Sequence, residues 1–138
     1  MEEKEFNCHK IAEGTASGEI LISSDDICFY LIDPETGVVI EKGHDLEGRS
    51  VAGKVLVVPT GKGSSVVQAD GLYQLQLHGN APRALIIKHP DTVLVASAIV
   101  MGIPMVNKLG QDFYDYIENG KTAVVNSDLG KVTVSSGA

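Results

Sequence analysis

Val57-Val58-Pro59-Thr60-Gly61-Lys62-Gly63-Ser64-Ser65 is the stretch that decides how this 138-residue chain folds. It starts at the end of a short apolar run, 54–58, which has the composition of a buried strand. Behind it, apolar side chains recur at helical spacing until Gly79-Asn80 stops the pattern. The expected apolar face of this helix consists of Val66, Ala69, Tyr73 and Leu77. A strand, a glycine-rich loop and a helix in this order predict one unit of an α/β sheet.

The same alternation continues downstream of this unit. The continuous apolar run 84–87 predicts a buried strand, and Pro90-Asp91 opens a second helix that Gly102 closes. The apolar face expected for that helix includes Val93, Ala96 and Val100. The later elements predicted are a strand at 103–106, a short helix at 111–118, and strands at 122–125 and 131–134.

The half of the chain before the stretch is rich in β-type sequence. Apolar and β-branched runs predict strands within 12–23, 27–32 and 38–40, and Asp33-Pro-Glu-Thr-Gly37 predicts a turn between the last two. A β-rich half that leads into a βαβαβ half favours three layers, with strands packed against a helix-covered parallel sheet. We expect an N-terminal tail at 1–10 and a single domain at 11–135.

Composition excludes several classes of function. The net charge is −7, with 11 Lys and Arg against 18 Asp and Glu, so the chain lacks the basic surplus of a nucleic-acid binder. The longest mostly apolar run, 92–107, contains Gly102 and Pro104 and is short for a membrane span. Without a signal sequence, and with only Cys8 and Cys28, the chain is expected to be cytoplasmic with free thiols.

The 60–66 loop, Thr60 to Val66, is where chemistry is expected. Ligands of open α/β sheets bind beyond the carboxyl ends of strands, and the first amides of a helix favour an anion. A serine held at that positive end carries a developing alkoxide at the least cost. The same residues also fit a simpler interpretation, in which Gly61 and Gly63 shape a turn and a serine caps the helix. The pattern alone leaves both interpretations open.

No metal site is predicted in this chain. His9, His44, His78 and His89 show no metal-ligand spacing with a carboxylate or a cysteine, so structural or surface roles are expected for all four.

Several segments in order resemble the small subunit of the aconitase X family. They are Asp33-Pro-Glu-Thr-Gly37-Val-Val-Ile, Gly48-Arg-Ser-Val-Ala-Gly-Lys54, Pro59-Thr-Gly-Lys-Gly-Ser-Ser65, Tyr73-Gln-Leu and Ala81-Pro-Arg-Ala-Leu-Ile87. The resemblance covers most of the chain after residue 10. It implies a swivelling β/β/α domain, similar to the small domain of aconitase, that exists as its own polypeptide.

The resemblance also implies a function. In the archaeal branch of the family, the complex is a hydro-lyase that converts (R)-5-phosphomevalonate to trans-anhydromevalonate 5-phosphate in the mevalonate pathway of isoprenoid biosynthesis. The large subunit is expected to hold the substrate and a [4Fe–4S] cluster, and the small chain to hold no cofactor and to form a heterodimer with it. By match to the family's Gly-Ser-Ser element, Ser64 is the general base. Gly61, Lys62, Gly63 and Ser65 are expected to contact substrate, with Ser65 the more plausible helix cap.

Two other functions fit parts of the sequence. The closing segment 120–132 resembles phosphohistidine-carrying swivel domains, but Ser64 stands where those domains need a histidine. A non-catalytic module that binds an anion at the 60–66 loop would use the same residues.

Overall fold

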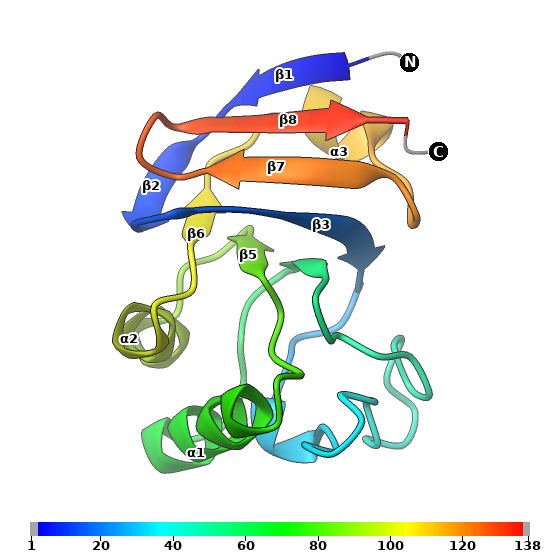
Figure 1. Ribbon diagram of the computed structural model, residues 1–138, viewed down its shortest axis with the longest axis vertical. Helices are drawn as coiled ribbons and strands as arrows, with labels where there is room; N and C mark the ends of the chain where they lie inside the picture. The colour runs from blue at the N-terminus through cyan, green and yellow to red at the C-terminus, as the bar shows by residue number, and fades with distance from the viewer. Residues whose placement is uncertain (1–2, 137–138) are drawn as a thin grey trace.

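The computed structural model describes residues 3–136 and has three layers (Figure 1). An antiparallel sheet forms the first layer, a mainly parallel sheet the second, and helices α1 and α2 the third. The strand order is β1-β8-β7-β3-β4-β5-β6-β2. The three-layer β/β/α arrangement expected from the sequence is confirmed.

Strand β3 belongs to both sheets. Its first five residues pair antiparallel with β7, and its last three pair parallel with β4. The carboxyl ends of β3, β4 and β5 therefore share one edge. The strands are β1 Glu3–Asn7, β2 His9–Ala12, β3 Thr15–Ile22, β4 Val55–Val58, β5 Ala84–Ile87, β6 Met105–Asn107, β7 Thr122–Asn126 and β8 Lys131–Ser135.

The helices are α1 Ser65–Leu77, α2 Thr92–Met101, α3 Gln111–Tyr116 and the 3-10 helix η1 Phe29–Leu31. The Asp91 carboxylate accepts from the Leu94 amide at the start of α2, and Gly102 ends that helix in the left-handed region, as its sequence signals predicted. No helix within residues 3–136 has the length and apolar character needed to cross a membrane.

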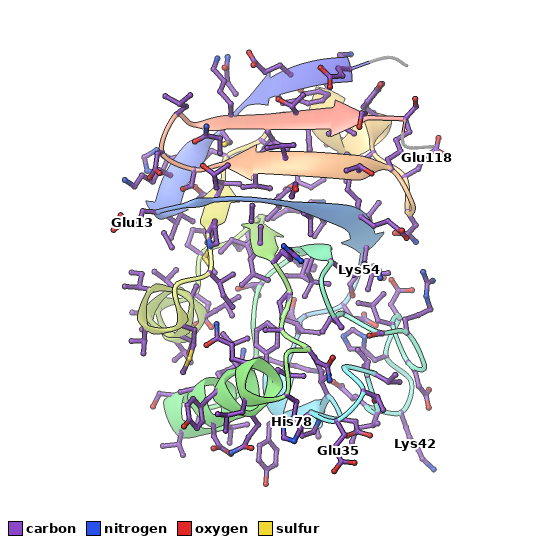
Figure 2. All side chains as sticks on the ribbon, in the orientation of Figure 1. Glu13, Glu35, Lys42, Lys54, His78 and Glu118 are labelled. Carbon is purple, nitrogen blue, oxygen red and sulfur yellow. The ribbon has the colours of Figure 1, made fainter. Side chains whose placement is uncertain are left out.

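The parallel strands are buried on both faces because their side chains alternate between two cores. Leu56 of β4 and Leu85 of β5 pack toward α1 and α2, whereas Val57 and Ile86 pack toward the antiparallel sheet. Side chains fill the space between the strands and the two helices (Figure 2). These two cores hold the carboxyl edge of the sheet, from which the 60–66 loop projects.

Residues 3–10 differ from the expected tail. Strand β1 pairs with β8, and β2 pairs with β6, so both strands form edges of the sheets. Phe6 is buried and meets Phe113 edge to face, with 5.2 Å between ring centroids. The acidic composition concealed this pairing because the other β1 side chains are exposed.

Two predicted strands are absent from the described chain. Residues 27–32 form the short helix η1 and two isolated bridges, and 38–40 make only isolated bridges. Their buried residues, Ile27, Phe29, Ile32 and Val39, belong to the core that α1 covers. Backbone groups of both segments bond to loops and to a side chain instead of a strand ladder. The prediction of strands at 27–32 and 38–40 was therefore wrong.

The predicted faces of α1 and α2 are also corrected. The buried residues of α1 are Gln68, Gly71, Leu72 and Leu75, while Val66 and Leu77 are exposed. On α2 the buried residues are Leu94, Ser97 and Ala98, while Val100 is exposed. Both helices are apolar on several sides, so periodicity located the helices without fixing which side faces the core.

Candidate functional site

The 60–66 loop follows β4, includes the first two residues of α1, and is fastened to the segment before η1. Ile27 forms a parallel bridge with Gly61: its amide donates to the Thr60 carbonyl, and its carbonyl accepts from the Lys62 amide, both at 3.0 Å. A Cβ on Gly61 would lie 2.7 Å from Nε2 of Gln68. Glycine is therefore needed here because protein atoms occupy the space of a side chain.

Gly63 turns the chain into the helix. Its φ of 109° lies in the region that residues with a side chain rarely adopt. The turn places Ser64 at the N-cap of α1, where its Oγ accepts from the Val67 amide at 3.4 Å. Ser64 therefore caps the helix, and the expectation that Ser65 does so is wrong, because Ser65 is already the first helical residue.

The Ser64 side chain is exposed at the positive end of a helix of 13 residues. The first amides of a helix have no acceptor within the helix, so Ser65 and Val66 present N–H groups at this end. An anionic oxygen at Ser64 would lie in the favourable field of these groups and of the helix dipole. The geometry is suited to a developing alkoxide or to a bound anion.

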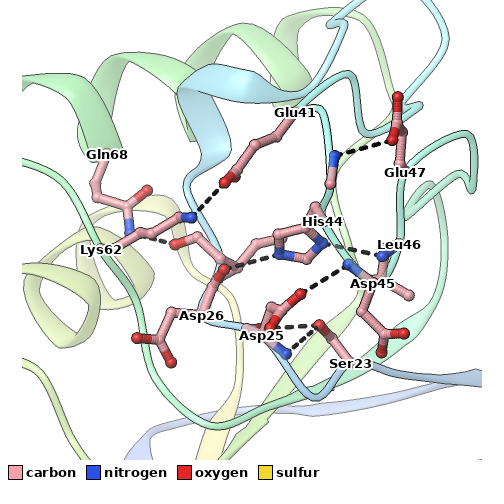
Figure 3. A network of polar contacts seen from close by, with 12 residues as sticks. Ser23, Asp25, Asp26, Glu41, His44, Asp45, Leu46, Glu47, Lys62 and Gln68 are labelled. Atoms are coloured by element: carbon pink, nitrogen blue, oxygen red, sulfur yellow. Dashed lines mark hydrogen bonds and ion pairs between the residues drawn. The ribbon is translucent and has the colours of Figure 1, made fainter.

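Lys62 does not point at either serine. Its ammonium group forms a hydrogen-bonded ion pair with Glu41, which the polar segment after β3 supplies (Figure 3). The hydrogen bond to Glu41 raises the pKa of Lys62. Lys62 thus remains a cation, with part of its charge balanced by a neighbour.

Ser65 lies on the other side of the loop, at a shallow apolar groove between α1 and α2. The residues that line this groove are Ser65, Ala69, Val93, Ala96, Ser97, Val100 and Met101. The structure therefore brings Gly61, Gly63 and Ser64 together in one turn, with Lys62 directed toward Glu41 and Ser65 toward α2.

Gln68 is the residue that the sequence analysis missed. Its side chain is fully buried, its Nε2 donates to the Ile27 carbonyl at 3.0 Å, and its Oε1 accepts from the Phe29 amide at 2.8 Å. A glutamine four residues after a helix cap, among apolar neighbours, was the available signal. Such a polar side chain is buried only when it is fully hydrogen-bonded.

A polar network supports the segment that carries Glu41 (Figure 3). His44 is buried; its Nε2 donates to the Asp26 carbonyl at 2.8 Å, and its Nδ1 accepts from the Leu46 amide at 3.0 Å. The Asp25 carboxylate accepts from the Asp45 amide at 2.8 Å. His44 therefore has the structural role expected of it.

A separate hollow of about 580 Å³ lies at the carboxyl edge of the sheet. Its wall includes Val58, Pro59, Lys88 and His89, and none of the residues predicted for the site. Lys88 lies 4.5 Å from the ring centroid of Tyr114, so its charge is already engaged with an aromatic face.

The remaining histidines are exposed, and the His78 ring bonds to the Gln74 carbonyl of its own helix. Within residues 3–136, no three His, Cys, Asp or Glu side chains converge into a group that could hold a metal. Cys8 and Cys28 are both free thiols, and Cys28 is buried beneath Gly63. Within residues 3–136 there is no metal centre, and the candidate place for chemistry is the 60–66 loop.

Comparisons with known proteins agree with this architecture. The family model of the aconitase X swivel domain matches residues 5–134. The crystal structure of Thermococcus kodakaraensis aconitase X in its holo-form superposes with a TM-score of 0.85 at 34% identity, covering 96% of this chain and 98% of that one.

Several relatives are named phosphomevalonate dehydratase small subunit. The protein of Methanosarcina mazei is 41% identical over 92% of this chain and 88% of its own length. The protein of Methanocella arvoryzae is 43% identical over 92% of this chain and 96% of its own length. Because the match spans nearly the whole of each protein and the fold is the same, the chain belongs to the aconitase X swivel-domain family.

Proposed function

We propose that this chain is the small subunit of a two-subunit hydro-lyase that dehydrates (R)-5-phosphomevalonate to trans-anhydromevalonate 5-phosphate. The names of the relatives support this substrate, and the small-subunit names support a large partner chain. The observation that carries the proposal is the exposed Ser64 hydroxyl at the N-terminus of α1. Ser64 is the general base in this proposal.

The reaction needs two events at neighbouring carbons. A proton must leave the carbon beside the carboxylate, and the hydroxyl group must leave the next carbon, so that a double bond forms between them. Ser64, as an alkoxide, would accept the carbon-bound proton from within hydrogen-bonding distance. The product then carries one double bond, and the released groups together make one water.

The surroundings of Ser64 suit this task. The Val67 amide already donates to Oγ, and a hydrogen bond to the charged form of a group lowers the cost of ionising it. The positive end of α1 acts in the same direction. We place Gly61, Lys62 and Gly63 against the substrate, with Lys62 exchanging part of its pairing with Glu41 for a substrate anion. Ser65 would contact the substrate through its backbone amide, because its side chain faces α2.

The large subunit would supply what this chain lacks. The side chains described here do not fit a cluster, so the [4Fe–4S] cluster of this proposal belongs to the partner. Its iron would supply Lewis acidity toward the departing hydroxyl group. The 60–66 loop would dock onto the partner, and closure of this domain would exclude water from the reacting atoms.

The test separates the base from the helix cap, because Ser64 fills both positions. Ser64→Asn keeps a side chain that caps helices well but removes the hydroxyl. In the complex reconstituted with the large subunit, turnover of 5-phosphomevalonate by this variant should fall by about 10² or more. Its thermal unfolding and its assembly should remain near those of the unsubstituted complex.

Ser65→Ala and Ser64→Thr are the matched controls. Ser65→Ala should reduce turnover less, and Ser64→Thr should retain activity because it keeps both hydroxyl and cap. If Ser65→Ala is the inactive variant and Ser64→Asn is active, the base is Ser65. If both variants keep full activity in an assembled complex, the chain is a binding module and the proposal fails.

A further inference from the structure

We infer that Gln68 is a positioning residue that sets the place of the Ser64 hydroxyl, an inference that rests on the proposed function. Gln68 does not reach Ser64 with its side chain. It holds the two segments between which the 60–66 loop is fixed.

The side-chain amide of Gln68 has one possible orientation. The Phe29 amide can only donate, so the atom facing it at 2.8 Å must be Oε1. The Ile27 carbonyl can only accept, so the atom facing it at 3.0 Å must be Nε2. Both hydrogen-bonding ends of a fully buried side chain are thereby used on one short segment.

That segment in turn fixes the loop. The Ile27 carbonyl also accepts from the Lys62 amide, and the Ile27 amide donates to the Thr60 carbonyl. The Ile27 carbonyl is thus shared between the Gln68 side chain and the loop backbone. Any shift of Ile27 would move Thr60 and Lys62 with it.

Gln68 is connected to Ser64 from the other side as well. Its backbone amide donates to the Ser64 carbonyl at 3.0 Å, as the first helical bond of α1. Gly61 lies against Nε2 with no room for a side chain. The loop that carries Ser64 is therefore held between the backbone and the side chain of the same residue.

Losing this clamp should affect the chemical step more than substrate binding. A base must lie within hydrogen-bonding distance of the proton it removes, and a displacement of about 1 Å can reduce a rate by about 10². Apart from the contacts of the 60–66 loop itself, the groups that bind the substrate would lie on the large subunit and would remain in place. The expected signature is a lower kcat with little change in KM.

The experiment uses the reconstituted complex and 5-phosphomevalonate. Gln68→Met, which has similar volume and no hydrogen bonds, should lower kcat per folded complex by about tenfold or more while KM changes by less than about threefold. Gln76→Met is the matched control on the same helix, where the exposed side chain donates only to the Met101 carbonyl. It should leave both constants unchanged.

Gln68→Glu provides a readout that a purely structural role would not move. As a carboxylate it places an oxygen against the Ile27 carbonyl, and the two acceptors repel. When protonated it can donate to that carbonyl while still accepting from Phe29. The kcat of this variant relative to the unsubstituted complex should therefore rise as the pH is lowered.

Each outcome decides the inference. Unchanged kcat in Gln68→Met overturns it, as does a pH-independent kcat ratio in Gln68→Glu. If neither variant assembles with the partner, Gln68 has a structural role alone and the inference is rejected. Ser64→Asn measured alongside separates the two hypotheses: full activity there rejects the proposed base whatever Gln68 does, whereas an inactive Ser64→Asn with a fully active Gln68→Met rejects only the role of Gln68.

Discussion

Gly71 of α1 lies directly against the peptide bond between Phe29 and Tyr30: a Cβ on Gly71 would lie 2.4 Å from the Phe29 carbonyl carbon and from the Tyr30 nitrogen. This contact sets how closely η1 approaches α1. The same approach brings the Phe29 amide within 2.8 Å of Gln68. A glycine in the middle of a helix, which propensity disfavours, thus positions the segment that fastens the 60–66 loop.

Gly71→Ala should destabilise the chain by about 3 kcal/mol, although alanine is the better helix former. The added methyl group meets backbone atoms, which cannot move aside without shifting η1. Urea unfolding of the isolated chain measures the effect. Asp70→Ala, at an exposed neighbouring position, should change stability by less than about 0.5 kcal/mol. A Gly71→Ala variant as stable as the original would show that η1 relaxes freely.

Tyr114→Phe should stabilise the fold by about 1 kcal/mol, because the buried Tyr114 hydroxyl has no hydrogen-bond partner within residues 3–136. Burial also raises the pKa of Tyr114 from its ordinary 10.0 to about 12. Between these two values the unfolded chain releases the proton and the folded chain retains it. The free energy of unfolding should therefore fall as the pH rises through this window.

Thermal unfolding of both proteins from pH 8 to 12 measures this effect. The Phe variant lacks the ionisable group at this position, so its advantage should increase above pH 10. A constant difference between the two proteins across that range would mean that the tyrosine titrates normally in the fold.

The elements after Val57 could be read from the sequence because each depends on local signals. Asp91 and Gly102 bound α2, as expected of a helix that Pro90-Asp91 opens and Gly102 closes, and the continuous apolar run 84–87 is β5. The conformation of 27–32 could not be predicted in this way. It is decided by Gly71 and Gln68, which lie some 40 residues away along the chain.

The candidate site was predictable to the same extent. Glycine spacing placed a turn and a serine at the start of α1, and Gly63 and Ser64 occupy those positions. The partner of Lys62 was not predictable, because Glu41 comes from an irregular segment with no periodic pattern. The function of the loop came from a family resemblance, because a capping serine and a catalytic serine have the same local sequence.

His44→Leu should lower the free energy of unfolding by about 2 kcal/mol. The ring bridges the Asp26 carbonyl and the Leu46 amide in a buried place, and leucine would leave both groups unpaired. The control is His78→Leu, because the exposed His78 ring bonds to a carbonyl of its own helix; this substitution should change stability little. Equal effects of the two substitutions would contradict a bridging role.

Hydrogen exchange gives a second test of His44. The segment that it supports carries Glu41, the partner of Lys62. Relative to the unsubstituted chain, the leucine variant should show faster exchange at the amides of residues 41–48. Exchange of the amides of β4 and β5, which lie in the core, should be accelerated less. Uniform acceleration throughout the chain would instead indicate global destabilisation.

Val66→Asp should weaken assembly with the large subunit by about tenfold or more, since a charge placed in a docked apolar contact must lose its water. Val66 is 75% exposed and follows the two serines of the 60–66 loop, which we propose to be covered by the partner. Titration of the large subunit with labelled small chain measures the dissociation constant. The matched control is Leu129→Asp, because Leu129 is 72% exposed in the turn between β7 and β8. That turn belongs to the antiparallel sheet, which is the layer away from α1 (Figure 1). Neither substitution should unfold the chain, since both side chains already face water. Loss of assembly in Leu129→Asp with full assembly in Val66→Asp would place the partner on the antiparallel sheet and remove Ser64 from the shared site.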